Sequence, residues 1–243
     1  MCYYNNLKRM KLALILYGIS LEINRYWQYG ALYSIDYNNS YDNYQRYIFD
    51  YFKGKGYDID VYISTNNLNS DDDIAEIIDK YKPVKYRIAD DNDNGEGYEG
   101  YEGYEGYEDG EEGEDDKDCI ISRNKKLESG IDLCIEGGGE YDLVLITRFD
   151  LLFQKDFADS NIQFDKINIV SVLERPNLIC DNFYLFPHKY LKDFQKVIRK
   201  CANINHRNIK NDLEKIAPIN YILNENRDIS ELSFYKIAKT SYI

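Results

Sequence analysis

A cation and an anion, separated by one residue, end the segment YDLVLITRFD at residues 141–150. The apolar run at 143–146 is typical of a strand buried on both faces, and it gives way abruptly to Arg148 and Asp150. Alternate residues of an extended chain point to the same side, so we expect these two side chains to share a face. A guanidinium can grip a diphosphate with two hydrogen bonds, and a carboxylate can hold Mg²⁺ or Mn²⁺. The alternative is an arginine that only pairs with a surface carboxylate.

The strand before this pair is one of several that alternate with amphipathic helices along the chain. The predicted strands are 12–18, 57–65, a short one after Pro83, 143–146, 167–173, 178–186 and an edge strand at 232–237. The predicted helices are 41–52, 70–81, 120–135, 190–201 and one from Asn211 to about residue 224. This order predicts an α/β domain with a doubly wound, mostly parallel central sheet flanked by helices. Ligands bind beyond the carboxyl ends of such strands, where Arg148 and Asp150 are expected.

The charge of the chain is concentrated in one segment. The formal net charge is −13, but residues 90–118 carry 15 acidic residues and one basic residue, which leaves 28 acidic and 29 basic residues elsewhere. Gly-Tyr-Glu repeats four times at residues 97–108, a composition that cannot bury a core. We therefore expect one domain over residues 1–243 with a disordered acidic insert at 90–118. A near-neutral remainder disfavours a nucleic-acid partner.

The amino-acid composition excludes several kinds of metal site and disulfide framework. Two histidines exclude a histidine-rich metal centre, and five cysteines without a C-x-x-C pair suggest neither a disulfide framework nor a zinc ribbon. A reducing, cytoplasmic compartment fits this cysteine usage. No segment approaches the ~20 apolar residues that span a bilayer. Carboxylates must therefore carry any acid–base chemistry.

Two other patterns have simple structural interpretations. The triplet Gly137-Gly138-Gly139 precedes a strand, whereas phosphate-binding glycine loops follow one, so we interpret it as a helix-to-strand turn. Five basic residues lie along one side of the helix at 190–201 and its start: Lys189, Lys192, Lys196, Arg199 and Lys200. They indicate a solvated face. The sharper alternative is a surface that receives the acidic insert.

The chain resembles nucleotide-sugar glycosyltransferases of the GT-A type, and more narrowly the small glycosyltransferase-like proteins of large DNA viruses and bacterial polysaccharide clusters. The resemblance rests on a first strand ending in Tyr17-Gly18, a second ending in VYIST at 61–65, and the segment ending in Arg148-Phe149-Asp150. It implies a single GT-A-like, Rossmann-like domain. Asp150 matches the last carboxylate of the family's Asp-x-Asp motif, which binds a divalent metal and the diphosphate. Arg148 replaces the first carboxylate, which leaves metal dependence open.

The same resemblance suggests a residue that faces the acceptor. Asp181, in the sequence CDNFY at 180–184, precedes an aromatic pair as does an acidic residue in similar proteins. Asp181 is then the general base that deprotonates the acceptor hydroxyl. The alternative is an aspartate at a helix start or in a turn. Glu214 is a weaker candidate, because acidic residues are common at helix starts.

The function expected from this resemblance is transfer of a sugar from a nucleotide diphosphate donor to a hydroxyl of a glycan or protein acceptor. Tyr17 and Gly18 would receive the nucleotide, Arg148 and Asp150 the diphosphate, with or without Mn²⁺ or Mg²⁺, and Asp181 the acceptor. The alternative is a scaffold of this type that has lost catalysis and acts as an interaction or structural protein.

Overall fold

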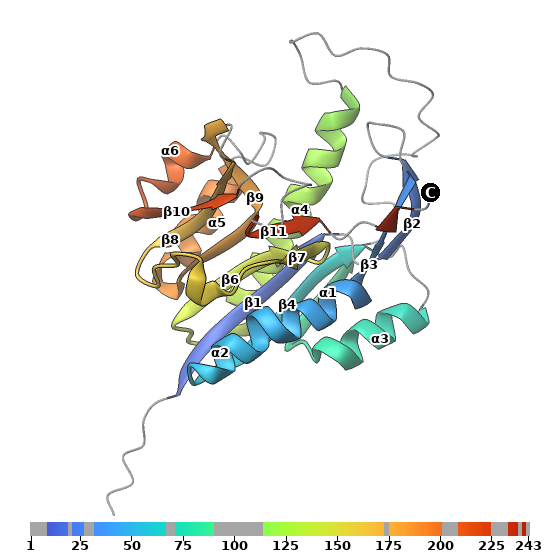
Figure 1. Cartoon of the computed structure of the whole chain (residues 1–243), viewed down its shortest axis with the longest axis horizontal. Helices are drawn as coiled ribbons and strands as arrows, with labels where there is room; N and C mark the ends of the chain where they lie inside the picture. Colours follow the sequence, from blue (N-terminus) through green and yellow to red (C-terminus); the bar gives the residue numbers. More distant parts are fainter. Residues whose placement is uncertain are drawn as a thin grey trace, which may run out of the picture.

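A seven-stranded sheet forms the centre of the protein (Figure 1). The computed structural model describes residues 9–18, 21–26, 32–66, 71–89, 114–172, 175–200, 209–224, 233–237 and 240–241. The sheet order is β10-β8-β9-β6-β1-β4-β5. Its strands are β1 (Met10–Gly18), β4 (Tyr57–Asn66), β5 (Lys85–Ala89), β6 (Leu143–Arg148), β8 (Ile167–Val172), β9 (Arg175–Pro187) and β10 (Ile219–Asn224).

The strand order contains a reversal beside β1. From β1 the chain adds β4 and then β5, each parallel to its neighbour, and it then crosses back to place β6 on the other side of β1. In the second half of the sheet β9 runs antiparallel to both β6 and β8, while β10 is parallel to β8. The predicted α/β fold with a mostly parallel sheet is confirmed. The reversal puts the topological switch point between β1 and β6.

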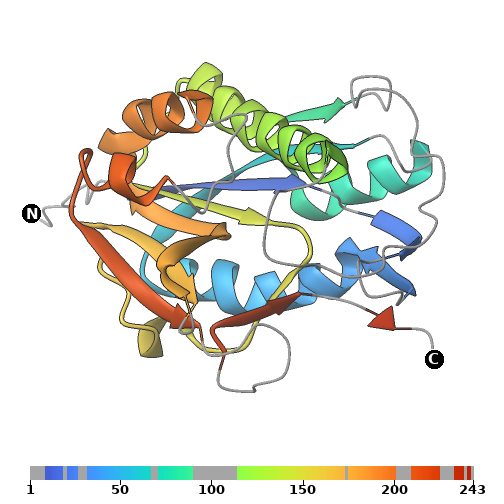
Figure 2. The same ribbon diagram turned by 90° about the horizontal axis from the view of Figure 1, so that it is seen from above.

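Helices cover both faces of the sheet, as Figure 2 shows. On one face lie α1 (Tyr37–Tyr44), the π-helical turn η1 (Gln45–Asp50), α2 (Tyr51–Gly54) and α3 (Asp71–Tyr81). The other face packs against α4 (Glu114–Gly137), α5 (Leu191–Lys200) and α6 (Lys210–Leu213). Because successive strand residues point to opposite faces, β1 supplies Leu12, Leu14 and Leu16 to the first layer and Ala13, Ile15 and Tyr17 to the second. This Rossmann-like architecture is held by two hydrophobic layers.

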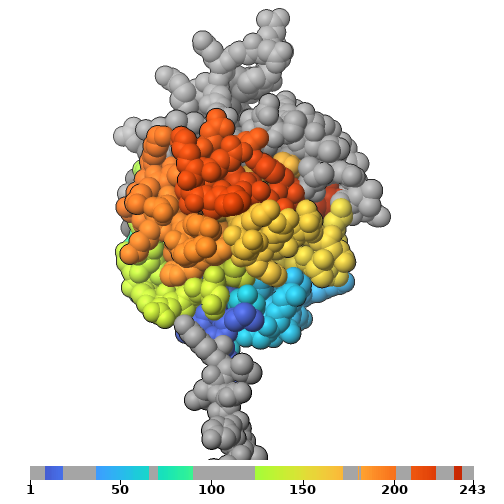
Figure 3. Space-filling view, turned by 90° about the vertical axis from the view of Figure 1, so that its left-hand side faces the viewer, coloured from blue at the N-terminus to red at the C-terminus, as the bar shows by residue number. Residues whose placement is uncertain are grey.

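The predicted helix from Asn211 to about residue 224 is wrong. The helix α6 ends at Leu213, and residues 219–224 form β10, whose Ile219 pairs with Ile167 of β8. Pro218 explains the change, since proline disfavours helix in the residue before it and cannot donate a helical hydrogen bond. Figure 3 shows residues 209–224, in red-orange, beside the yellow segment that contains β8.

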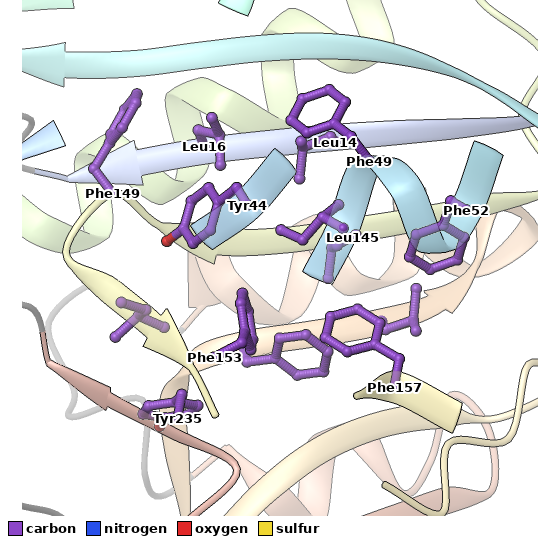
Figure 4. Packing of buried hydrophobic residues seen from close by; sticks show 14 of the residues in the cluster. Leu14, Leu16, Tyr44, Phe49, Phe52, Leu145, Phe149, Phe153, Phe157 and Tyr235 are labelled. Atoms are coloured by element: carbon purple, nitrogen blue, oxygen red, sulfur yellow. The ribbon is translucent and has the colours of Figure 1, made fainter. Parts of the chain in front are cut away.

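Aromatic rings fill the layer under η1 and α2 (Figure 4). The Phe153 ring lies 5.6 Å from the Tyr44 ring and 5.2 Å from the Phe157 ring, with Phe52 5.9 Å from Phe157, measured between centroids. The predicted helix at 41–52 lies within this helical segment, which starts earlier, at Tyr37, and includes the wider π turn. Edge-to-face contacts of this kind stabilise beyond their buried area.

Short strands outside the central sheet were not all predicted. The strand β7 (Leu151–Phe153) pairs with β11 (Tyr235–Ile237), which confirms a strand at the end of the chain. A second small sheet joins β2 (Leu21–Tyr26), β3 (Leu32–Asp36) and β12 (Thr240–Ser241). Two 3₁₀ turns, η3 (Phe157–Asp159) and η4 (His188–Tyr190), complete the elements.

The helix α4 begins at Glu114, so residues 114–118 are helical and do not belong to the disordered insert that the sequence predicts at 90–118. Residues 90–113 of the predicted insert and Ser70, where the helix at 70–81 was expected to begin, lie outside the described residues. The glycine triplet is the turn that its position predicts: α4 ends at Gly137, and Gly138 takes the left-handed conformation with φ +66°. Within the described part of the chain, no helix has both the length and the apolar character that a bilayer span needs.

Candidate functional site

Three of the predicted site residues meet at the switch point. Strands β1 and β6 end side by side, with Tyr17 opposite Arg148 in the parallel register. Gly18 follows with φ +98°, a left-handed conformation that glycine adopts without strain. A Cβ on Gly18 would lie 3.9 Å from Cγ of Arg148. The carboxyl ends of the two strands therefore bring together Tyr17, Gly18 and Arg148, where ligands bind in open α/β sheets.

Tyr17 positions this strand end without presenting its ring to solvent. Its side chain is fully buried in the layer beneath α4. Its carbonyl oxygen accepts a hydrogen bond from the backbone N–H of Phe149 at 3.3 Å. That bond ties β1 to the turn after β6 and so fixes the direction in which the chain leaves Arg148.

The side chain of Arg148 is held in place by Asp150. The Arg148 Nε donates to Asp150 Oδ1 at 2.7 Å, and Nη2 donates to Asp150 Oδ2. The Arg148 side chain is 23% exposed, whereas that of Asp150 is only 3% exposed. The two side chains are in contact, but β6 ends at Arg148, so the turn at residues 149–150 and not strand alternation brings the carboxylate to the guanidinium. The carboxylate that pairs with Arg148 is buried, so this is not the surface ion pair of the alternative interpretation.

Asn182 is a site residue that the sequence analysis missed. Its Oδ1 accepts from Arg148 Nη1 at 3.3 Å, and its Nδ2 donates to Tyr235 Oη at 3.3 Å. The pairing between β8 and β9 jumps here, because Ile169 faces Tyr184 while the next residue, Val170, faces Cys180. Such a bulge re-aims side chains beside a site. In the sequence Asn182 is an amide within a predicted apolar strand, next to Asp181.

Asp181 lies inside β9, between Cys180 and Asn182. The expectation of a turn or helix-start aspartate is therefore wrong. The side chain of Asp181 lies outside the described residues, and its role as general base stays a prediction. Glu214 accepts a hydrogen bond from the Tyr221 hydroxyl at 3.0 Å on the surface near β10.

Tyr44 supports the site from the opposite layer. Its hydroxyl donates to the carbonyl oxygen of Arg148. Burial, followed by the nearby negative charge of Asp150, raises the pKa of Tyr44 well above its ordinary value. The hydroxyl is therefore protonated, and able to donate, throughout the physiological pH range.

The described residues do not fit a divalent metal at this position. Both carboxylate oxygens of Asp150 accept hydrogen bonds from Arg148. Within the ranges the structure describes, no three His, Cys, Asp or Glu side chains are grouped to share a cation. Asp150 therefore orients Arg148, and among the side chains that the structure describes no second carboxylate joins it as a metal ligand. The positive charge offered to a ligand comes from the guanidinium.

The basic residues of α5 are largely paired with carboxylates. Arg199 bonds to Glu128 and Asp132 of α4, Lys196 to Asp193 and Lys200 to Asp212. These pairs favour the solvated face over a surface that receives the acidic insert, because the charges already have partners. Of the two other predicted members, Lys189 lies over the Tyr190 ring at 4.8 Å.

A second polar group lies at the opposite end of the sheet. The Tyr141 hydroxyl donates to Asp60 Oδ2 at 2.9 Å and lies 2.6 Å from the Tyr62 hydroxyl. A hollow of about 360 Å³ beside it is lined by Arg9, Lys11, Glu140, Tyr141 and Asp142. It lies at the amino ends of β1 and β6, a full strand length from Arg148.

The fold is a doubly wound α/β fold. At its switch point lies Arg148, which a buried carboxylate, that of Asp150, holds in place. No protein-family profile and no curated protein matches the sequence. Among solved structures 107 chains match, and one is the nucleoside-diphosphate-sugar pyrophosphorylase from Vibrio cholerae RC9. This chain is similar to it with a TM-score of 0.44 and 11% sequence identity, over 88% of this chain and 92% of that one.

Proposed function

We propose that the protein binds a nucleotide sugar through its diphosphate at the carboxyl ends of β1 and β6, and transfers the sugar to a hydroxyl acceptor. The observation that carries this proposal is the position of Arg148: a partly exposed guanidinium, oriented by Asp150, at the switch point of the sheet. A planar guanidinium recognises phosphate oxygens with paired hydrogen bonds. Such a site favours an anionic ligand over a neutral sugar.

The proposed chemistry follows from where charge develops. As the bond between the anomeric carbon and the diphosphate breaks, the electron pair goes to the leaving diphosphate oxygen. A fixed guanidinium stabilises that charge more than it stabilises the bound donor, which accelerates the step. Asp150 and Asn182 keep the guanidinium in one orientation, so little reorganisation is needed during the reaction.

The acceptor half of the reaction is assigned to Asp181. Its place in β9, next to Asn182, puts its backbone beside the residue that contacts Arg148. A carboxylate there removes the proton of the acceptor hydroxyl as the sugar is transferred. Glycan and protein hydroxyls are both acceptors of this chemistry.

Thermal unfolding with a panel of nucleoside diphosphates and nucleotide sugars tests the proposal. A donor present at 100 times its dissociation constant stabilises the folded protein by about 2.7 kcal/mol. We expect one nucleotide type to raise the midpoint, and the Arg148→Lys variant to lose most of that shift because it cannot form two parallel bonds. Panels with and without Mn²⁺ show whether metal contributes. The absence of any shift in the unaltered protein would contradict the proposal.

Incubation of the stabilising nucleotide sugar with hydroxyl acceptors then separates an enzyme from an inactive scaffold. A transferase releases nucleoside diphosphate at a rate that depends on acceptor and falls in Asp181→Asn. If the protein binds the donor and releases no nucleoside diphosphate, it is the inactive scaffold described above as the alternative function.

A further inference from the structure

The carboxamide of Asn182 has two ends, and only one of them can accept a hydrogen bond from Arg148. Its Oδ1 accepts from Arg148 Nη1 at 3.3 Å, whereas a reversed amide would turn Nδ2, a donor, toward the same guanidinium. Asn182 is buried, so bulk water does little to set its orientation. The protein groups around Nδ2 therefore decide which end of the amide meets Arg148.

The groups around Nδ2 are the side chains of Tyr235 and Cys180. Nδ2 of Asn182 donates to Tyr235 Oη at 3.3 Å and to Cys180 Sγ at 3.4 Å. The Tyr235 hydroxyl in turn donates to Cys180 Sγ. Because a hydroxyl has a single proton, that bond leaves the Tyr235 oxygen as an acceptor for the amide. The direction of each bond thus favours the orientation in which Oδ1 faces Arg148.

These contacts lie in a buried environment. Cys180 is 4% exposed and Tyr235 is 3% exposed. Removing one partner of a buried hydrogen bond leaves the other without hydration, which costs free energy. The Asn182 amide therefore loses more by reversing than an exposed amide would lose.

Tyr235 comes from the short strand β11, 53 positions after Asn182 in the sequence. This strand runs antiparallel to β7 (Figure 1), with Ile237 opposite Leu151, the residue directly after Asp150. Residues 235–237 thus lie along the chain that follows Asp150, while the Tyr235 hydroxyl reaches Asn182 in β9. The strand therefore joins the two parts of the chain that hold Arg148.

We propose that Tyr235 is a positioning residue of the anion site. Its hydroxyl donates to Cys180 and accepts from Asn182, and so keeps Oδ1 of Asn182 directed at Arg148. Because Tyr235 is buried, it acts on a ligand through Asn182 and Arg148 and does not touch the ligand itself. The inference rests on the proposed function and makes the anion site depend on β11, a distant segment of the chain.

Calorimetric titration of the full chain with inorganic pyrophosphate tests the role of Tyr235. The variant Tyr235→Phe keeps the ring and removes only the hydroxyl, and we expect it to weaken binding by about fivefold, close to the net value of one hydrogen bond. The double variant with Asn182→Leu should bind no more weakly than Asn182→Leu alone, because both substitutions act on the same contact with Arg148.

The matched control is Tyr41→Phe. The Tyr41 hydroxyl also donates one hydrogen bond, to the carbonyl oxygen of Lys80 at 3.2 Å, between α1 and α3. Its removal should leave pyrophosphate affinity unchanged.

Side-chain NMR of the ligand-free protein gives a second measurement, which a tyrosine that only packs would not alter. The Nδ2 protons of Asn182, identified by their loss in Asn182→Leu, should exchange faster with solvent in Tyr235→Phe. The guanidinium signals of Arg148, identified by their loss in Arg148→Lys, should shift in the same variant because the amide that holds Nη1 turns more freely.

Three results would each overturn the positioning role: unchanged affinity in Tyr235→Phe, losses that multiply in the double variant, or unmoved Asn182 and Arg148 signals. If neither pyrophosphate nor any nucleoside diphosphate binds the unaltered protein, the proposed function itself fails. The NMR measurement still decides in that case whether Tyr235 orients Asn182.

Discussion

The two ends of β1 both carry buried polar side chains, yet they differ in what those side chains can do. At the carboxyl end Arg148 retains an exposed edge of 23%, oriented by Asp150 and Asn182. At the amino end the groups are Asp60, Tyr62 and Tyr141, and the two rings are 0% and 8% exposed. One end exposes part of a guanidinium, whereas at the other end the two tyrosine hydroxyls bond to each other and to Asp60.

The glycine turn packs closely against the two tyrosines of the amino end. A Cβ on Gly137 would overlap the Tyr62 hydroxyl, and one on Gly139 would overlap the Tyr141 hydroxyl. The ring of His188 packs edge-on against Tyr141 at 5.5 Å, and its burial, followed by the charge of Lys192, lowers the pKa of His188. These contacts explain the glycine triplet as a packing requirement. The polar cluster at the amino end is therefore tightly packed, whereas the cluster at the carboxyl end leaves part of Arg148 exposed.

We expect the largest effect on stability and on binding from a substitution at the carboxyl end of β1. Arg148→Leu leaves the buried carboxylate of Asp150 without its partner, which should cost about 3 kcal/mol of unfolding free energy and abolish pyrophosphate binding. The double variant Arg148→Leu with Asp150→Leu should recover most of the stability and none of the binding. Urea unfolding and calorimetry measure the two quantities separately. Binding that survives in the double variant would place the anion site elsewhere.

The next effect concerns the amino end. Gly139→Ala forces Tyr141 away from Asp60 and should lower the unfolding free energy by about 1–3 kcal/mol, the usual range for overpacking. Pyrophosphate affinity of the folded protein should not change. Gly54→Ala is the matched control, because a Cβ there meets nothing within 4 Å and helix favours alanine. A loss of affinity in Gly139→Ala would show that the two ends are coupled.

Alkaline pH should also act on the amino end. Burial is the main cause that raises the pKa of both Tyr62 and Tyr141 above the ordinary value of 10.0. Below pH 10 folded and unfolded chains both keep these protons, so stability is unaffected. Above it the unfolded chain releases them while the folded chain does not, and stability falls by up to about 1.4 kcal/mol per pH unit for each tyrosine.

Urea midpoints between pH 8 and pH 11.5 check this slope. The variant with Tyr62→Phe and Tyr141→Phe should start less stable and lose less stability as the pH rises. An unchanged slope would mean that these two hydroxyls already ionise in the folded protein.

The smallest expected effect sharpens the role of Asn182. Asn182→Leu removes the acceptor for Arg148 Nη1 and should weaken pyrophosphate binding by about fivefold, close to the net value of one hydrogen bond. If Asn182 acts through Arg148, its effect should largely vanish in the background of Arg148→Lys, whereas a purely structural role gives additive losses. Asn211→Leu, at an exposed position of α6, is the control.

A strand of the central sheet could be predicted wherever its local pattern of apolar residues matched the burial that the folded sheet gives it. The continuous apolar runs at 12–18 and 143–146 indicated strands covered on both faces, and the structure confirms them as parts of β1 and β6. The last helix failed because alternating apolar residues after Pro218 are compatible with two periodicities. These residues form a strand because they pair with β8, which lies about 50 residues earlier in the chain.

The sequence by itself determined that Arg148 and Asp150 lie close together, because only one residue separates them. It also determined the turn at the glycine triplet and the position of Arg148 at the end of a buried strand. Only the tertiary structure placed Tyr17 opposite Arg148 and brought Asn182 to its guanidinium through a bulge. Strand order and bulges are long-range properties, and no local pattern of residue types encodes them.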